Sequence, residues 1–354
     1  MTMTPSYALL TPYLVPTSQA GLKVTNLGDG LILRAIERLL KPGTPMGRYS
    51  PRATPPPVAQ AVMEQAPHVV LAGANQLDDR YSVWPGMSAE QLLRGAWRFV
   101  IFGVGLSGDP DRNRRMSEGT RAILEAIHQR TEYSSWRCPA TVRYLQAELP
   151  HLADRFLMTG CPVLMDQPLL EQPRFCSAER SVAVTATEHG DFWARETTII
   201  DRVARRFPRA RRYFVVHQDF CSKSVIARWS DRLRGRPGTT DPARALALRK
   251  YAASRGYHVL VPDTADVASA IYDAIDVHVG SRLHAHLLFL SRNKKSWLVP
   301  ADGGARSMAE AFAFPLVIAS RPEPDWNFDF EPLRQQVQRV HGDMQRFLTS
   351  WAVR

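Results

Sequence analysis

The chain has 354 residues, of which 45% are hydrophobic, and a formal net charge of +11. This composition excludes extensive disorder, and the length predicts two domains of ordinary size. We expect a cytoplasmic protein, because we find neither a leader sequence nor a run of the ~20 apolar residues that a membrane span requires.

The positive charge favours anionic partners, either small phosphorylated substrates or an anionic membrane surface at which the protein would be peripheral. Much of the excess lies in an arginine-rich segment, residues 202–212, which we interpret as a solvated helix face. No motif typical of nucleic-acid binding accompanies it, so we expect no nucleic-acid partner. The four cysteines are scattered and have no zinc-ligand spacing, and we expect no metal site.

The first predicted elements are a strand at residues 7–16 and a helix that begins after Asn26-Leu27-Gly28-Asp29-Gly30. Apolar residues follow this glycine-containing turn at helical spacing up to Leu40. Asn26, Gly28 and Asp29 are therefore candidates for substrate binding, although helix capping explains the same residues equally well. Residues 42–57 contain many prolines, and we expect them to form a surface excursion without a helix or central strand.

Strands and helices then alternate. Apolar runs at 68–72 and 98–102 each stop at a glycine, as buried parallel strands do at a binding edge. A helix is predicted over 116–129, a strand over 138–143, a helix over 144–148 and a strand over 155–162. This alternation predicts a doubly wound α/β domain over residues 1–173.

A second series of the same kind predicts another Rossmann-like domain over residues 174–325. Its strands are expected at 181–187, 213–217, 258–261, 274–279 and 297–299. Residues 326–354 form an amphipathic C-terminal docking helix. Two such domains face one another across a cleft, and ligands bind beyond the carboxyl ends of the strands.

The most informative stretch is Val277 to His286. An apolar strand ends at Gly280-Ser281, and a helix with Arg282 and His284 in its first turn begins directly afterwards. The free N–H groups of a helix N-terminus favour an anion, and the guanidinium and imidazole add donors to the same place. Gly280, Ser281, Arg282 and His284 are thus candidates for binding a phosphate or carboxylate. His286 faces another side of the helix and is interpreted as structural.

The order of these motifs resembles that of the polysaccharide pyruvyl transferase family. The matching pieces span nearly the whole chain: Asn26-Leu-Gly-Asp29, Gly103-Val-Gly105, Val142-Arg143, Thr159-Gly-Cys-Pro162 and Gly280-Ser-Arg-Leu-His284.

The resemblance implies a fold of two Rossmann-like domains like that of the GT-B glycosyltransferases. It implies phosphoenolpyruvate as donor substrate, no further cofactor, and a sugar of a cell-surface polysaccharide, or its lipid- or nucleotide-linked precursor, as acceptor. It also implies roles for Arg282 and His284, and for Arg143, whose family counterpart follows the corresponding strand and helps to hold the donor.

The residues suit this chemistry in themselves. Histidine has a pKa near neutrality and can act as the acid or base, and arginine grips carboxylate and phosphate in bidentate fashion. We therefore assign His284 as acid/base, Arg282 as a catalytic anion clamp and Arg143 as a second clamp. His217 and Asp219, at a strand end, are weaker candidates.

The chain departs from the family at one place. Where a lysine usually follows in an Asp-Pro-Lys sequence, this chain has Asp302-Gly-Gly-Ala-Arg306. We expect Arg306 to supply the missing charge, with the glycines giving the loop the freedom to bring it in. Two alternatives stay open: a glycosyltransferase of the same architecture that uses a nucleotide-sugar donor, and a non-catalytic member that binds a glycan.

Overall fold

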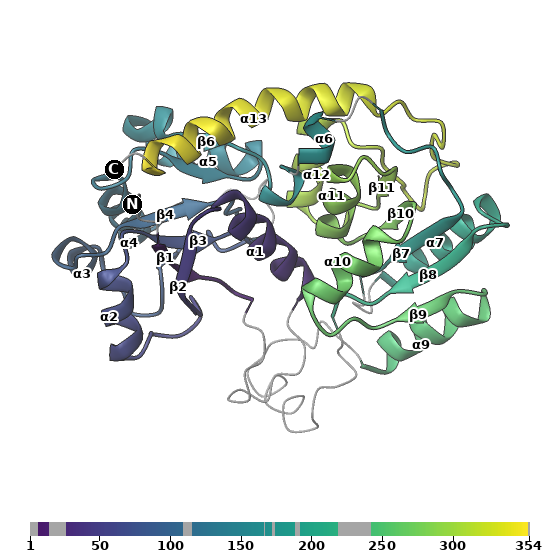
Figure 1. Ribbon diagram of the computed structural model, residues 1–354, viewed down its shortest axis with the longest axis horizontal. Coiled ribbons are helices and arrows are strands. Elements are labelled where there is room, and N and C mark those ends of the chain that lie inside the picture. The colour runs from purple at the N-terminus through teal and green to yellow at the C-terminus, as the bar shows by residue number, and fades with distance from the viewer. Residues whose placement is uncertain are drawn as a thin grey trace.

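The computed structural model describes residues 6–13, 26–108, 115–165, 167–171, 174–187, 192–218 and 242–352. Two parallel β-sheets, each flanked by helices, form two domains that face one another (Figure 1). The prediction of an α/β protein with two Rossmann-like domains and a C-terminal helix is therefore confirmed.

The N-terminal sheet has the strand order β2-β1-β3-β4 and is parallel throughout. β3 and β4 are buried along their whole length, as expected for strands covered on both faces. A bridge between Val104 and Trp136 continues the sheet into the paired strands β5 and β6. The bounds are β1 Ser6–Leu10, β2 Thr44–Tyr49, β3 Val69–Ala72, β4 Phe99–Phe102, β5 Ser134–Trp136 and β6 Phe156–Met158.

Side-chain caps fix the ends of several helices in this domain. Asn26 caps α1, Ser117 caps α4, and Ser88 with Gln91 forms a capping box on α3. The α-helices are α1 Leu27–Leu39, α2 Pro57–Gln65, α3 Ala89–Arg94, α4 Glu118–His128, α5 Pro139–Glu148 and α6 Gln167–Glu171, with 3₁₀ turns at Pro150–Arg155 and Pro162–Leu164.

One local prediction in this domain was incomplete and one was wrong. The proline-rich stretch 42–57 contains no central strand, as expected, but it does contain β2, which pairs with β1 at the edge of the sheet, where proline is tolerated. The strand predicted over 138–143 is instead the first half of α5, because Pro139 occupies the first turn of that helix. The strand lies four residues earlier, at β5.

The C-terminal sheet has the order β11-β10-β7-β8-β9, also parallel. From central β7 the chain moves to β8 and β9 on one side and then to β10 and β11 on the other, which is the order reversal of a doubly wound sheet. The strands are β7 Ser181–Thr185, β8 Arg211–Val215, β9 His258–Leu260, β10 Val277–Gly280 and β11 Ser296–Leu298; the helices are α7 Trp193–Arg206, α9 Pro242–Ser254, α10 Ala265–Asp273, α11 Leu283–Ser291 and α12 Gly303–Phe312.

The two domains pack closely through α1, which lies against α10 and α11. A Cβ on Gly30 would lie 2.6 Å from the Cβ of Ala265, so a glycine is required at this crossing. The backbone N–H of Ala265 also donates to Tyr13 Oη at 3.0 Å, and one apolar cluster runs through both domains. The interface therefore holds the facing edges of the two sheets in a fixed relation.

The C-terminal helix α13 (Glu331–Ala352) leaves the C-terminal domain and runs back along the N-terminal one (Figure 1). It packs against β5 and β6, and the ring of Phe347 lies edge-on to Phe102 of β4 with centroids 4.9 Å apart. Among the described residues, no helix is long and apolar enough to span a membrane.

Candidate functional site

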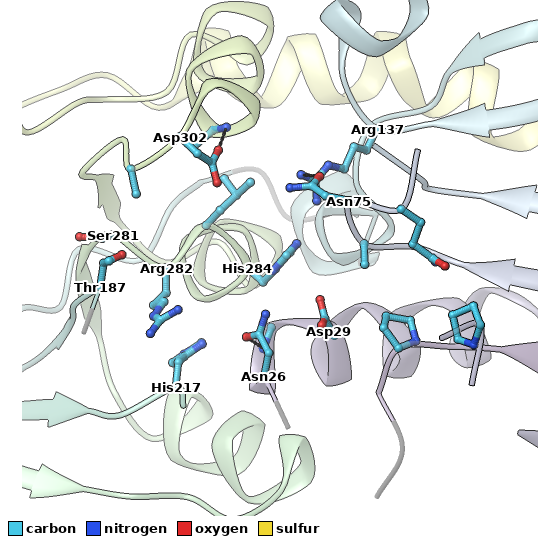
Figure 2. A pocket seen from close by; sticks show the side chains of 18 of the residues that line it. Asn26, Asp29, Asn75, Arg137, Thr187, His217, Ser281, Arg282, His284 and Asp302 are labelled. Carbon is cyan, nitrogen blue, oxygen red and sulfur yellow. Dashed lines mark hydrogen bonds between the residues drawn. The ribbon is translucent and has the colours of Figure 1, made fainter. Parts of the chain in front are cut away.

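A pocket of about 620 Å³ lies between the two sheets, at the carboxyl ends of their strands (Figure 2). Pro12 follows β1 and Asn75 follows β3, where the N-terminal sheet reverses its order; Thr187 follows β7 and Ser281 follows β10, where the C-terminal sheet reverses. Ligands of doubly wound sheets bind at such reversal points. The pocket therefore combines the expected binding edges of both domains.

The turn from β10 into α11 is fixed against β7. A Cβ on Gly280 would lie 2.2 Å from the carbonyl oxygen of Thr185, so only glycine fits there. The Ser281 N–H donates to that carbonyl at 2.8 Å, and its hydroxyl donates at 2.7 Å to the buried carboxylate of Glu196. Arg282 Nε donates to the carbonyl of Ala186 at 2.9 Å. Gly280 thus shapes the turn, while Ser281 and Arg282 line the pocket.

His284 points from α11 toward the N-terminal domain (Figure 2). Its ring packs on Gly28, where a Cβ would lie only 2.6 Å from Nδ1. Its buried Nε2 has no hydrogen-bond partner among the described residues. Burial, together with the positive charges of Arg137 and Arg282, lowers the pKa of His284 to about 3. The side chain is therefore neutral near pH 7 and able to accept a proton.

The start of α1 forms the facing wall. Asn26 Oδ1 accepts a hydrogen bond from the Gly28 N–H at 3.0 Å, so the capping interpretation holds for Asn26, and the same residues also line the pocket. Burial raises the pKa of Asp29 to about 6, against the opposing effects of Arg52, Arg137 and the hydrogen bond with Asn26. A carboxyl group that exchanges protons near neutrality thus lies on the same pocket as the neutral His284.

Arg137 is the site residue that sequence reasoning missed. It directly follows β5, is only 3% exposed, and donates to Asn75 Oδ1. A Cβ on Gly105 would lie 2.3 Å from its Nε and one on Gly304 3.2 Å from its Nη2, so two glycines make room for the guanidinium. Among the described residues, no carboxylate lies within 4.0 Å of it.

Arg143, the arginine chosen from the sequence, is exposed on α5 and lies outside the pocket. The error follows from the misplaced strand, because the arginine that directly follows β5 is Arg137, six residues before Arg143. The Pro139 that begins α5 was the available signal, since proline favours the first turn of a helix and not the interior of a strand.

Arg306 is also outside the pocket. Asp302 caps α12 by accepting from the Ala305 N–H at 2.7 Å, and Gly303 and Gly304 belong to the first turn of that helix. They form no mobile loop, and Arg306 lies exposed in the following residues of the helix. The expected replacement of the family lysine by Arg306 is therefore not supported by its position. What Gly304 provides is space for Arg137.

Of the remaining residues of interest, some line the pocket and others do not. His217 lines the pocket, and its Nε2 is 2.5 Å from the hydroxyl of Tyr272, while Asp219 lies outside the described residues. Arg52, which follows β2, lines the pocket and was not foreseen.

His286 is fully buried on the far side of α11, with Nδ1 2.7 Å from Ser296 Oγ, as a structural role requires. Within the described parts of the chain, no three His, Cys, Asp or Glu side chains are grouped to hold a metal ion.

Comparison with known proteins identifies no family. No protein-family model and no curated protein matches the chain. Among solved structures, the UDP-GlcNAc 2-epimerase of Methanocaldococcus jannaschii is 12% identical, with a TM-score of 0.44 over 96% of this chain and 93% of that one. The corresponding enzyme of Neisseria meningitidis is 11% identical, with a TM-score of 0.42 over 99% and 94%. A structure of accessory secretory proteins 1, 2 and 3 of Streptococcus pneumoniae is 9% identical, with a TM-score of 0.41 over 83% of this chain, which spans 56% of the matched chain. Similarity at this level assigns no activity.

Proposed function

We propose that the interdomain pocket binds phosphoenolpyruvate and transfers its enolpyruvyl group to a sugar of a polysaccharide or its precursor, forming a pyruvate ketal. The observation that carries the proposal is the placing of Arg137 and Arg282, from opposite domains, on the two sides of His284 (Figure 2). Phosphoenolpyruvate carries two anionic groups, a carboxylate and a phosphate, and each guanidinium can bind one of them in bidentate fashion.

The buried charge of Arg137 adds to the argument. A cation that is removed from water and lacks a carboxylate partner is costly, and a bound anion would offset this cost. The family counterpart of Arg143 follows a strand and helps to hold the donor; in this chain the arginine that follows the strand is Arg137, and we transfer the role to it.

The reaction needs groups that give and take protons. A proton is added to the methylene carbon of the donor, one acceptor hydroxyl attacks the neighbouring carbon and loses its proton, inorganic phosphate leaves, and a second hydroxyl closes the ketal and releases another proton. His284, neutral in the empty pocket, is suited to accept a proton, and Asp29, with its raised pKa, is the nearest candidate for an acid. A bound dianion opposes the effect of both arginines and so raises the pKa of His284, allowing it to carry a proton through the reaction.

A glycosyltransferase with a nucleotide-sugar donor is the second candidate, favoured by the volume of the pocket, which exceeds what phosphoenolpyruvate alone would fill. Against it, the carboxylates among the described lining residues are Asp29, on the N-terminal domain, and Asp302, which is used to cap α12. Neither is placed beside Arg282 to bind a ribose. We therefore prefer the first candidate, with the remaining volume available to the acceptor.

Ligand-dependent thermal stability separates the two candidates. A ligand that binds only the native state stabilises it by about 2.7 kcal/mol at a concentration of 100 times Kd. We expect a rise in melting temperature with phosphoenolpyruvate, a smaller rise with inorganic phosphate, and none with UDP-sugars. Stabilisation by a UDP-sugar alone would refute pyruvyl transfer, and stabilisation by oligosaccharides alone would indicate a non-catalytic glycan-binding protein.

The roles of His284 and Arg282 can be tested separately. We expect His284→Ala to reduce turnover by about 100- to 10,000-fold, the usual contribution of a positioned acid or base, while the stabilisation by phosphoenolpyruvate is kept. Arg282→Ala should instead weaken that stabilisation. Unchanged turnover of His284→Ala would remove this residue from the mechanism.

A further inference from the structure

A second pocket, of about 490 Å³, lies on the N-terminal domain outside the proposed active site. Trp84 and Trp97 contribute to its lining; both side chains are largely buried, and their rings lie edge-to-face with centroids 5.6 Å apart. Thr54, Gln60, Gln91 and Arg94 contribute polar groups to its walls. Nothing in the proposed transfer step uses these residues.

The same two loops line both pockets. In the loop after β2, Pro51 and Arg52 line the interdomain pocket and Thr54 lines the second pocket; in the loop after β3, Ser82 lines the former and Trp84 the latter. Two residues span at most about 7 Å of chain. The Thr54 hydroxyl donates to the Pro85 carbonyl at 2.8 Å and ties the loops together. The two pockets therefore lie close together, within the reach of one chain-like ligand.

The two pockets differ in charge. Arg52, Arg137 and Arg282 line the interdomain pocket. In the second pocket the one charged lining residue among those described, Arg94, is ion-paired with Glu90 of the same helix. The other polar groups of the second pocket are a hydroxyl and two amides. Each makes one hydrogen bond within the protein, which leaves the lone pairs of Thr54 Oγ1 and Gln60 Oε1 and the N–H groups of Gln91 Nε2 for a ligand. These groups fit a neutral ligand with many hydroxyl groups, and the indoles in the lining fit the apolar face of a sugar ring.

The entrance of the second pocket is open. Gly86, which lines it, has φ +85°, and a Cβ there would meet no atom within 4 Å. Pro85 and Gly86 are both exposed. Both residues therefore lie at the rim, where the pocket opens to solvent.

We propose that the second pocket binds a neutral sugar unit of the acceptor, further along the same glycan chain from the unit that reacts in the interdomain pocket. This inference rests on the proposed function in one respect, that the ligand of the second pocket is the acceptor of the transfer. It implies that the acceptor is an oligosaccharide or longer chain and not a single sugar.

The test uses the full-length protein and a panel of neutral tetrasaccharides built from glucose, galactose, mannose or N-acetylglucosamine, with the matching monosaccharides. Binding is followed through the indole N–H signals of Trp84 and Trp97 in NMR spectra. We expect at least one tetrasaccharide to move these signals, and the double variant Gln60→Ala/Arg94→Ala to weaken that binding about tenfold, the effect of losing two hydrogen bonds of modest strength. The matched control, Gln65→Ala/Arg98→Ala, changes two exposed residues of the same domain that do not line the pocket.

A panel in which no tetrasaccharide moves the indole signals would overturn the inference, as would equal binding by the double variant and the control. The result is separable from that of the proposed function. If phosphoenolpyruvate fails to stabilise the protein while a tetrasaccharide still binds at Trp84 and Trp97, the second pocket remains a sugar site and pyruvyl transfer is refuted. If phosphoenolpyruvate stabilises the protein but no tetrasaccharide binds at Trp84 and Trp97, only the assignment of the second pocket is wrong.

Discussion

Two groups of arginines account for much of the charge of this protein, and the structure uses them differently. Arg202, in the arginine-rich segment, donates to the carbonyls of Ile318, Ala319 and Arg321. Arg206, one helical turn further, is ion-paired with Glu179. Arg137, by contrast, is buried at the pocket and donates to a neutral amide.

The difference separates structural from functional charge. An arginine that gives both Nη groups to backbone carbonyls, as Arg202 does, holds segments together and has few donors left for a ligand. The arginine-rich segment is more than the solvated helix face that we expected, because it spans the end of α7, a turn and the start of β8, and Arg202 is nearly buried. A buried arginine without a carboxylate is the kind that gains from binding an anion.

The largest effect is expected for Arg137→Met, which keeps the apolar volume and removes the charge. We expect a loss of about 100-fold or more in kcat/KM, because hydrogen bonds to charged groups contribute ~1.5–3 kcal/mol each. The melting temperature of the unliganded protein should change little, since the desolvation cost of a buried charge is removed together with its hydrogen bond to Asn75 and its attraction to Asp29. Steady-state kinetics and thermal unfolding measure the two quantities. A large drop in stability would place Arg137 with the structural arginines and contradict the distinction.

Arg202→Met should show the opposite pattern. The carbonyls of Ala319 and Arg321 lose the donor that Arg202 gives them, while that of Ile318 keeps the Arg321 N–H, and leaving buried acceptors unsatisfied costs ~1–3 kcal/mol each when water cannot reach them. We expect the free energy of unfolding to fall by about 2 kcal/mol in total, because the partly exposed carbonyls regain water. Urea denaturation measures this, and kcat/KM below the unfolding transition should change less than twofold. A selective loss of donor affinity with normal stability would show that the segment takes part in binding.

Periodicity and turn chemistry were sufficient to predict most of this fold. The apolar runs ending at Gly73, Gly103 and Gly280 are strands, and the turns at Asn26 and Gly280 begin helices with pocket-lining residues. These signals are local: a buried strand needs consecutive apolar residues, and a close backbone approach needs glycine.

The features that the sequence did not predict depend on contacts between distant segments. β2 is a strand because β1 offers it a free edge, and its own sequence Thr-Pro-Met-Gly-Arg-Tyr has no strand pattern. Arg52 reaches the pocket only because β2 joins the sheet. Arg137 was missed because β5 is just three residues long, too short to show a period, so the strand was placed on the apolar residues of α5.

The smallest effect is expected for Arg143→Ala, six residues from Arg137. Its side chain is exposed on α5 and does not line the pocket, and exposed substitutions away from special features usually change stability by less than about 0.5 kcal/mol. We expect kcat/KM and the stabilisation by phosphoenolpyruvate to match those of the unaltered protein. The variant is therefore the matched control for Arg137→Met, since both remove one arginine from the same short region of chain and change the net charge equally. If Arg143→Ala weakened donor binding as much as Arg137→Met does, the effect would come from the overall charge of the region, and the assignment of Arg137 as the donor clamp would fail.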